Sequence, residues 1–244
     1  MKFIFDLDGT ICFKGQPLSA DICTAINGCV EAGHEVIFAS ARPIRDILPV
    51  LPKSFHGFRM VGGNGVFVYQ NNEIDVAGFP EDAKQALLEL IEEFRLPYLV
   101  DGRWDYSFTG DKSHPIFRNL DPQKTASNVR LEELDGIVKI VLFTQSKDIE
   151  ERIERLAVTV HKHGDEGILD ISPAGIHKWS GLQKLGLQED EFIAFGNDTN
   201  DISMFNYAKE SICVGDNAIA KAHATQFTTE AHVAQTIRAL SVAY

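Results

Sequence analysis

Residues 2–10 read KFIFDLDGT, a short apolar run that stops abruptly at two acidic residues. The run at 3–5 contains residues that favour β-structure, and it is typical of a parallel strand buried on both faces. Asp6 and Asp8 follow at positions i and i+2, and Gly9 lets the chain turn. Because open α/β sheets bind ligands at the carboxyl ends of their strands, these carboxylates predict a site there. The alternative is that Asp-Leu-Asp-Gly is merely a turn, since Asp and Gly are common turn formers.

The spacing of these two carboxylates also predicts a bound cation. Asp6 and Asp8 would repel each other unless a divalent ion lay between their oxygens. A small number of hard oxygen ligands suits Mg²⁺. If the segment is only a turn, no ion is required, and this stretch alone leaves both interpretations open.

The composition is that of an ordinary globular protein with an excess of acidic residues. Hydrophobic residues make up 44% of the 244 residues and charged residues 24%, so the chain can bury a sizeable core as one large or two small domains. The formal net charge of −12 argues against nucleic acids and anionic membranes as general partners, because both bind basic surfaces. We therefore expect no nucleic-acid partner and no membrane partner.

Three features predict a cytoplasmic protein. The cysteines show neither CxxC nor Cys/His ligand spacing, so they predict inert thiols in a reducing compartment rather than a structural zinc site; they are Cys12, Cys23, Cys29 and Cys213. The first strand begins at the N-terminus and leaves no room for a signal peptide. No apolar stretch has the length needed to span a bilayer.

Apolar strands and amphipathic helices alternate at both ends of the chain. In the first part, a helix capped by Ser19 precedes a strand at 34–39. The same alternation returns from Lys178, where a helix precedes the apolar strand at 192–195. This pattern is typical of βαβ units and predicts an α/β fold with a Rossmann-like parallel sheet.

The middle of the chain lacks this alternation. A strongly amphipathic helix is expected at 81–94, and short strands follow it at irregular intervals. We therefore expect an inserted α+β domain at 78–172, between the two core segments 1–77 and 173–244.

Polar residues follow three of the predicted core strands, and the sheet brings them together. They are Asp6 and Asp8, then Ser40, then Asn197, Asp198, Asn200 and Asp201, with Lys178 preceding the last group. The carboxyl ends of parallel strands lie on one edge of a sheet, so these residues are expected to converge on one pocket. Carboxylates around a cation, together with a lysine and a hydroxyl, fit an anionic substrate such as a phosphate.

Taken in order, these segments resemble the four motifs of the haloacid dehalogenase (HAD) superfamily of phosphotransferases. The motifs are DLDGT at 6–10, Ser40, Lys178 and GNDTND at 196–201. The NG at 64–65, the insertion and VGDNA at 214–218 are similar to the Cof-type phosphatases of class IIB, which carry a C2-type cap. The resemblance covers the whole chain and implies the HAD fold, with the insertion as the cap.

The resemblance implies a covalent mechanism. Asp6 would be the nucleophile that forms an aspartyl-phosphate, with Thr10 supporting its loop. Asp8 would protonate the leaving alkoxide and later deprotonate the hydrolytic water. Lys178 would neutralise the nucleophile and the transferring group.

The resemblance also implies the residues that bind phosphate. Ser40 and the amide of Ala41 would hold phosphoryl oxygens, and Asn200 would reach the phosphate. For Ser40, Lys178 and Asn200, a purely structural role is the alternative. Ser40 could cap the next helix, Lys178 could face solvent, and Asn200 could be a turn residue.

The implied Mg²⁺ site departs from the family pattern. Its ligands would be Asp6, the backbone carbonyl of Asp8 and the fourth motif, which usually reads GDxxND. Here Asn197 occupies the position of the first Asp, so one formal charge is missing. We expect Asn197 to bind the ion through its carbonyl oxygen, with Asp201 close by, and Asp198 is the alternative ligand.

The cap would select the leaving group of the substrate. Polar and aromatic residues in the insertion are candidates for contact with a sugar; they are Asp101, Arg103, Trp104, His161 and His163. The two histidines alternate along an expected strand, so the alternative is that they lie on its exposed face.

The expected function is a Mg²⁺-dependent phosphatase of a small phosphorylated metabolite, in particular a sugar phosphate, acting as a monomer or small homo-oligomer. A phosphomutase of sugar phosphates is one alternative. A catalytically silent module that binds metal or phosphate is another. Retention of both Asp6 and Asp8 argues against the silent module, because such a protein need keep neither.

Overall fold

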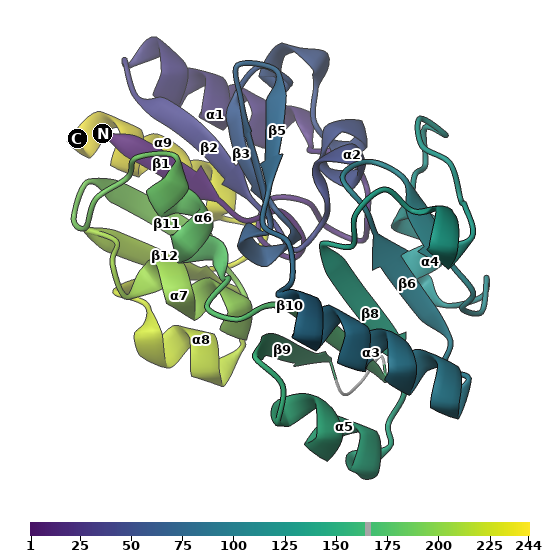
Figure 1. Ribbon diagram of the computed structural model, residues 1–244. Coiled ribbons are helices and arrows are strands. Elements are labelled where there is room, and N and C mark those ends of the chain that lie inside the picture. The colour runs from purple at the N-terminus through teal and green to yellow at the C-terminus, as the bar shows by residue number, and fades with distance from the viewer. Residues whose placement is uncertain (164–166) are drawn as a thin grey trace. The chain divides into compact units, whose positions relative to one another are not determined.

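The computed structural model describes residues 1–163 and 167–244, and the chain forms two compact units (Figure 1). The core unit comprises Met1–Glu73 and His177–Tyr244, and the insert unit comprises Ile74–Ile176. The core unit contains most of the larger β-sheet, and the insert unit contains the smaller one. The prediction of an α/β fold with a parallel sheet and an inserted α+β segment is confirmed.

Among the described residues, the core sheet has eight strands in the order β13-β12-β11-β1-β2-β3-β4-β5. Their bounds are β1 Lys2–Phe5, β2 Glu35–Ala39, β3 Arg59–Gly62, β4 Phe67–Gln70, β5 Glu73–Val76, β11 Phe192–Gly196, β12 Glu210–Val214 and β13 Gln226–Thr228. Neighbouring strands from β13 to β3 are parallel. The next strand, β4, runs antiparallel to its neighbour β3.

Helices cover both faces of this sheet. They are α1 Ala20–Glu31, α2 Ile44–Ile47, α6 Lys178–Lys184, α7 Ile202–Phe205, α8 Ala218–His223 and α9 Val233–Ala243. Helices α6, α7 and α8 pack on the face that carries Ile4 and Ile37, through buried residues such as Trp179 and Phe205. Helices α1 and α9 pack against each other on the opposite face (Figure 1). The strands are therefore buried on both faces, which explains their continuous apolar sequences.

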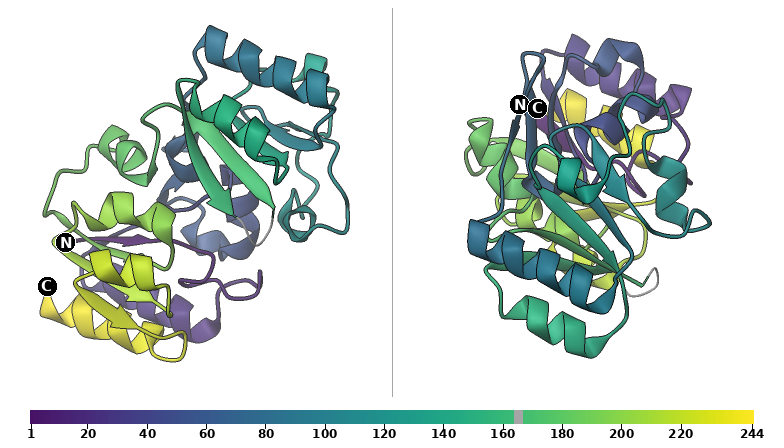
Figure 2. Two further views of the ribbon diagram at one scale, coloured as in Figure 1. Left: turned by 90° about the horizontal axis from the view of Figure 1, so that it is seen from below. Right: turned by 45° about the vertical axis from the view of Figure 1, so that its right-hand side comes forward.

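Five strands within the described residues form the insert sheet, in the order β7-β6-β8-β10-β9 with antiparallel neighbours. Its elements are α3 Glu81–Phe94, β6 Tyr98–Asp101, β7 Tyr106–Phe108, α4 Pro115–Asn119, β8 Lys139–Phe143, α5 Lys147–Glu154, β9 Val158–His163 and β10 Ile168–Pro173. Helices α3 and α5 cover one face of this sheet (Figure 2, left). Leu87 and Ile91 of α3 and Ile153 of α5 are buried there.

The other face of the insert sheet carries a smaller apolar cluster that includes Leu99, Phe108 and Val141. A buried ion pair lies beside it, with Nζ of Lys139 2.9 Å from Oδ2 of Asp170. The two faces therefore differ in character, one apolar under helices and the other partly charged.

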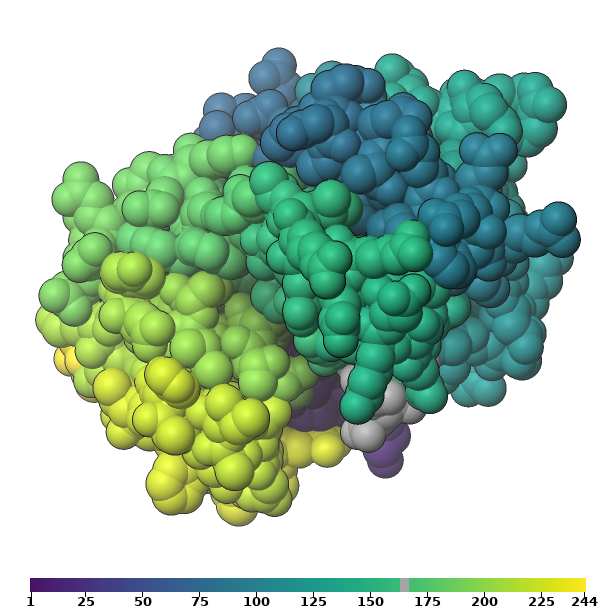
Figure 3. Space-filling model, turned by 60° about the horizontal axis from the view of Figure 1, so that its bottom comes forward, coloured from purple at the N-terminus to yellow at the C-terminus, as the bar shows by residue number. Residues whose placement is uncertain are grey.

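The surface of the core unit is shown in part by Figure 3, where its C-terminal segment is yellow. Among the described residues, the most exposed large apolar side chains are Val242, Phe227 and Ile219. In the part of the chain that the structure describes, none of the helices combines the length and apolar character needed to cross a bilayer.

Candidate functional site

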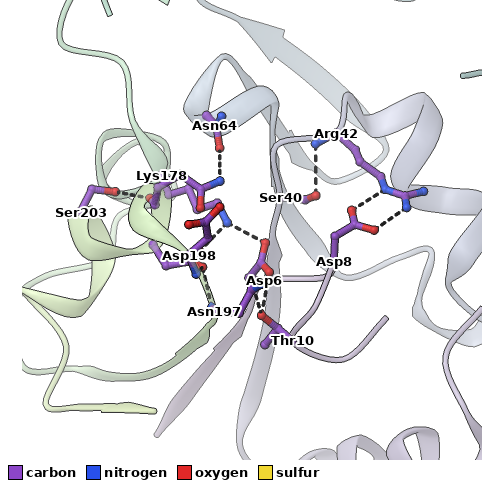
Figure 4. A network of polar contacts seen from close by, with 12 residues as sticks. Asp6, Asp8, Thr10, Ser40, Arg42, Asn64, Lys178, Asn197, Asp198 and Ser203 are labelled. Atoms are coloured by element: carbon purple, nitrogen blue, oxygen red, sulfur yellow. Dashed lines mark hydrogen bonds and ion pairs between the residues drawn. The ribbon is translucent and has the colours of Figure 1, made fainter. Parts of the chain in front are cut away.

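The polar strand ends of the core sheet meet because neighbouring strands are paired in register. Phe5 of β1 lies opposite Phe38 of β2 and Phe195 of β11. Asp6 and Asn197 therefore leave the sheet at nearly the same level, with Ser40 close behind (Figure 4). The predicted convergence of these segments on one edge of the sheet is thus observed.

Lys178 lies between two carboxylates in the interior of this site. Its Nζ atom lies 2.6 Å from Oδ1 of Asp6 and 2.6 Å from Oδ1 of Asp201. The Lys178 side chain is 0% exposed. The alternative that Lys178 faces solvent is therefore wrong.

The first turn of α6 fixes the backbone of Lys178. His177 precedes the helix and accepts a hydrogen bond at Nδ1 from the backbone N–H of Ser180, at 3.1 Å. In return, Ser180 Oγ accepts from the backbone N–H of His177 at 3.0 Å. This reciprocal cap satisfies two N–H groups that the helix itself leaves without partners.

The pKa values of Asp6 and Lys178 are shifted from their ordinary values. Burial raises the pKa of Asp6 to about 7, although the Lys178 ammonium lowers it and the Asp201 carboxylate raises it. Burial acts to lower the pKa of Lys178, but Asp201 and Asp6 outweigh it and raise that pKa. When both carboxylates are ionised, they share one ammonium group and leave one net negative charge. A further cation would balance that charge.

The side-chain amide of Asn197 lies where such a cation would bind. It is 2.9 Å from the Asp8 carbonyl oxygen and 3.2 Å from Oδ2 of Asp6. With its nitrogen on this side, the amide donates to both oxygens. With its oxygen on this side, three oxygens converge, which is an arrangement that a hard cation satisfies. One carboxylate, one backbone carbonyl and one amide therefore form a donor set that fits Mg²⁺.

This donor set contains one charged ligand, the Asp6 carboxylate. In residues 1–163 and 167–244, no group of three or more His, Cys, Asp or Glu side chains is placed to hold a metal ion. Beside Asp6, the donors of this set are the neutral oxygens of the Asp8 carbonyl and the Asn197 amide.

Two glycines allow the close approach of these segments. Gly9 has a φ of +79°, and a Cβ atom there would lie 2.3 Å from Nδ2 of Asn197. A Cβ atom on Gly196 would lie 2.4 Å from Cγ of Asp201. Thr10 completes the first loop, because its Oγ1 donates to Oδ2 of Asp6 at 2.7 Å.

Asp201 and Asp198 face different ways. Oδ2 of Asp201 accepts hydrogen bonds from the backbone N–H groups of Asn197 at 2.8 Å and Asp198 at 3.0 Å. Asp201 thus joins the fourth motif to Lys178. Oδ1 of Asp198 instead accepts from the backbone of Thr199 at 2.7 Å and from Nδ2 of Asn217 at 2.8 Å. Its carboxylate is therefore directed into its own loop.

Ser40 does not cap the helix that follows it. Helix α2 begins at Ile44 after Pro43, and Ser40 Oγ accepts a hydrogen bond from the backbone N–H of Arg42 at 3.1 Å. Ala41 lies next to Ser40 in the chain and is partly buried.

Asn200 is held in place by a second asparagine. Its Nδ2 donates to Oδ1 of Asn64 at 3.0 Å. Asn64 is buried, has a φ of +57°, and belongs to the GGNG segment after β3. This contact joins two segments of the site that are far apart in the sequence.

Two residues of the site were not predicted from the sequence. His177 caps α6, and Arg42 binds the side chain of Asp8. The available signal for Arg42 was its position two residues after Ser40, at the end of a core strand. For His177 it was its position directly before Lys178.

The candidate residues of the insertion fall into two groups. Cross-strand pairing places Asp101 opposite Lys139 and His161 opposite Asp170, on the face that carries the buried ion pair. Asp101 ends β6 and is 1% exposed.

The other candidates of the insertion support loops or lie outside the described side chains. Nη2 of Arg103 donates to the carbonyl of Ile74 at 2.8 Å, and Nε1 of Trp104 donates to the carbonyl of Thr125 at 2.9 Å. His163 ends β9, and its side chain lies outside the described part of the chain.

The cap at His177 predicts a pH-dependent stability. Burial lowers the pKa of His177 below its ordinary value of 6.5. The unfolded chain therefore binds this proton at a higher pH than the folded chain, so stability is lost as the pH falls below 6.5. We expect His177→Asn, which keeps an acceptor but cannot titrate, to reduce this loss. Urea unfolding at about pH 7.5 and about pH 5.5 measures it, and equal losses in both proteins would contradict the assignment.

Comparison with known proteins adds the family and its relatives. The family model described as haloacid dehalogenase-like hydrolase matches residues 3–237. The chain is 22% identical over 246 residues to the 5-amino-6-(5-phospho-D-ribitylamino)uracil phosphatase YitU of Bacillus subtilis (strain 168), covering 92% of this chain and 90% of that protein. It is 25% identical over 237 residues to the HMP-PP phosphatase of Yersinia enterocolitica, covering 87% and 82%.

Solved structures share the fold over nearly the whole chain. The HAD subclass IIB sugar phosphatase BT4131 has a TM-score of 0.80 and 17% identity, covering 99% of both chains. SMU.1108c from Streptococcus mutans UA159 has a TM-score of 0.83 and 22% identity, covering 100% of this chain and 99% of that chain. At these identities the likeness concerns the fold alone.

Proposed function

The chain belongs to the haloacid dehalogenase-like hydrolase family as a phosphatase of the Cof type, and we propose that it hydrolyses a small phosphorylated metabolite, in particular a sugar phosphate, through an aspartyl-phosphate. The observation that carries this proposal is the environment of Asp6. One of its oxygens binds the buried ammonium of Lys178, and the other lies beside the Asn197 amide. A carboxylate in such a setting is held in one orientation.

The proposed reaction has two displacements at phosphorus. Asp6 attacks the phosphorus atom, the bond to the alkoxide breaks, and Asp8 gives the alkoxide a proton. Water then attacks the aspartyl-phosphate, and Asp8 accepts its proton, which releases inorganic phosphate and restores Asp6. Lys178 balances negative charge on Asp6 and on the transferring group throughout.

The phosphoryl oxygens are assigned to Ser40, Ala41 and Asn200. The Ser40 hydroxyl accepts from the Arg42 amide, so its own proton can be donated to a phosphoryl oxygen. The backbone amide of Ala41 and the side chain of Asn200 are proposed to donate to the same group.

The proposed Mg²⁺ ligands are Asp6, the Asp8 carbonyl and Asn197. When bound, the ion supplies positive charge beside the transferring phosphoryl group. Asp201 bonds to Lys178 and to two backbone amides, which favours an orienting role over direct ligation. Asp198 is directed into its own loop, which argues against it as the alternative ligand.

The proposed domain roles follow the expected boundaries. Residues 1–77 and 173–244 are the catalytic core, and 78–172 are the cap that selects the leaving group. Among the cap candidates, Asp101 and His161 are the favoured contacts, because they share the partly charged face of the insert sheet. Arg103 and Trp104 are less favoured, because both already bind loop carbonyls.

A phosphate-release screen with Mg²⁺ tests the proposal. The panel should contain phosphorylated sugars, nucleotides and cofactors, with Asp6→Asn as the inactive control. The proposal is supported if the wild type releases phosphate from sugar phosphates and Asp6→Asn does not. Release from none of the compounds would reject it, and product analysis with a sugar bisphosphate activator would identify a phosphomutase instead.

The metal assignment has its own test. We expect Asn197→Ala to raise the Mg²⁺ concentration for half-maximal activity by about tenfold or more, because a proposed ligand is lost. Asp198→Ala, the matched control in the same loop, should change it much less. A Mg²⁺ titration of phosphate release measures both. The assignment is wrong if Asn197→Ala keeps the wild-type Mg²⁺ dependence while Asp198→Ala loses it.

A further inference from the structure

Arg42 binds the carboxylate of Asp8 through two parallel hydrogen bonds (Figure 4). Its Nε atom lies 2.6 Å from Oδ2 and its Nη2 atom 2.6 Å from Oδ1. This side-on pair is the geometry in which a planar guanidinium fixes both the position and the plane of a carboxylate.

The guanidinium is the fixed partner of this pair. The Arg42 side chain is 9% exposed, whereas the Asp8 side chain is 48% exposed. The backbone of Arg42 is anchored, because its N–H donates to Ser40 Oγ at 3.1 Å and its carbonyl accepts from Gly63 at 2.8 Å. Nη1 of Arg42 also donates to the carbonyl of Asp46 at 3.4 Å. Asp8 is therefore the partner whose orientation depends on the contact.

The backbone on either side of Asp8 is also constrained. The Leu7 carbonyl accepts from the backbone N–H groups of Thr10, Ile11 and Cys12, at 3.1, 3.0 and 2.7 Å. Because the backbone is held, the orientation of the Asp8 carboxylate depends only on its side-chain rotamer. The contact with Arg42 selects one of them.

The pair leaves Asp8 chemically accessible. Each carboxylate oxygen has two lone-pair directions, and the guanidinium occupies one on each oxygen. The remaining direction on each oxygen can hold a proton for a leaving group or accept one from water. Arg42 thus restrains Asp8 without blocking it.

We infer that Arg42 is a positioning residue for the reaction: it holds the half-exposed Asp8 carboxylate in the orientation from which Asp8 protonates the leaving group. This inference rests on the proposed function, because it assigns Arg42 a role through Asp8. A purely structural ion pair, which joins the loops after β1 and β2, is the alternative that the experiment must exclude.

The experiment compares two phosphate esters that differ in their need for a proton. Ribose 5-phosphate has an alkoxide leaving group, whereas p-nitrophenyl phosphate releases a phenolate that departs with little protonation. The ratio kcat/KM reports the steps up to phosphoryl transfer for both. We expect Arg42→Met to lower kcat/KM for ribose 5-phosphate about 10- to 100-fold, with little change for p-nitrophenyl phosphate.

A double-mutant cycle tests whether Arg42 acts through Asp8. In the Asp8→Asn background, Arg42→Met should have no further effect on the alkyl ester, because the group that it positions is already gone. If Arg42→Met does not fold, Arg42→Lys carries the same test. It keeps the charge but loses the side-on pair, so its loss on ribose 5-phosphate should be intermediate.

Arg59→Met is the matched control. Arg59 begins β3 and donates through Nε to Oε1 of Glu35 at 2.5 Å, at the opposite edge of the sheet from Asp6. Its removal should change both esters equally and slightly.

The possible failures can be told apart. An equal loss on both esters with Arg42→Met, or a loss that persists in the Asp8→Asn background, would overturn the positioning role alone. A wild-type chain that releases no phosphate from either ester would overturn the proposed function, and this inference with it.

Discussion

Asp6→Asn is expected to lower phosphate release by roughly 10⁴-fold or more, because the substitution keeps the side-chain volume and removes the proposed nucleophile. The fold should persist. Lys178 keeps Asp201 as its partner, and the neutral amide of Asn removes a buried negative charge whose desolvation disfavours the folded chain. We therefore expect unfolding in urea at the wild-type midpoint or above it.

Two measurements separate a lost nucleophile from a damaged site. Acid quenching should trap an acyl-phosphate in the wild type and none in Asp6→Asn. Asp198→Asn makes the same chemical change at a carboxylate that faces its own loop, and its turnover should stay within about tenfold of wild type. Turnover of Asp6→Asn in that same range would reject the covalent mechanism.

Lys178→Met is expected to reduce both activity and stability severely. The substitution leaves Asp6 and Asp201 buried without the ammonium that lies 2.6 Å from each of them. Removing one partner of a buried ion pair costs about 3–5 kcal/mol, because the remaining charge is left uncompensated. Phosphate release should fall about a thousandfold, because the charge that stabilises the transferring group is lost.

The loss of stability should depend on pH in a defined direction. Burial raises the pKa of Asp6 and the Lys178 ammonium opposes this, so without Lys178 the folded chain holds the Asp6 proton more tightly than the unfolded chain and stability falls as the pH rises. Urea unfolding should therefore show a larger deficit at about pH 8 than at about pH 5.5. Lys139→Met, which removes a buried lysine from an ion pair of the insert unit, is the control for lost lysine packing. A deficit independent of pH would show that lost packing, rather than charge, explains the effect.

The residues that meet at the sheet edge could be predicted, because parallel pairing places the carboxyl ends of all these strands at the same edge. Asp6, Ser40 and Asn197 each follow a strand of one sheet, and register alone brings their backbones together. The burial of Lys178 could not be predicted in this way. It depends on the first turn of α6, where His177 replaces the usual short polar cap.

Side-chain directions were the least predictable part of the site. The contact between Arg42 and Asp8 depends on how two loops bend after their strands, and periodicity carries no information on this. The hydrogen bond from Asn217 to Asp198 also depends on loop geometry, because Asn217 lies in the loop before α8, where it caps that helix. Helix α8, Ala218–His223, was not predicted, because six residues are too few for helical periodicity to be visible.

In the insertion, the length of a helix decided whether it could be predicted. Its longest helix, Glu81–Phe94, has a clear apolar stripe and was predicted with the observed bounds. Residues 115–119 form a short helix that was not predicted, since a single turn is too short for periodicity to be visible.

The close approach at Gly9 and Gly196 affects how a mutational scan of this chain would be interpreted. Neither glycine carries a functional group, yet a methyl group at either position would overlap Asn197 or Asp201. Alanine at these positions would displace a proposed metal ligand or the residue that holds Lys178. A scan that scores activity alone would therefore group both glycines with the catalytic carboxylates. Measuring the amount of folded protein beside activity would separate these two glycines, whose substitution disturbs the backbone and packing of the site, from the catalytic carboxylates.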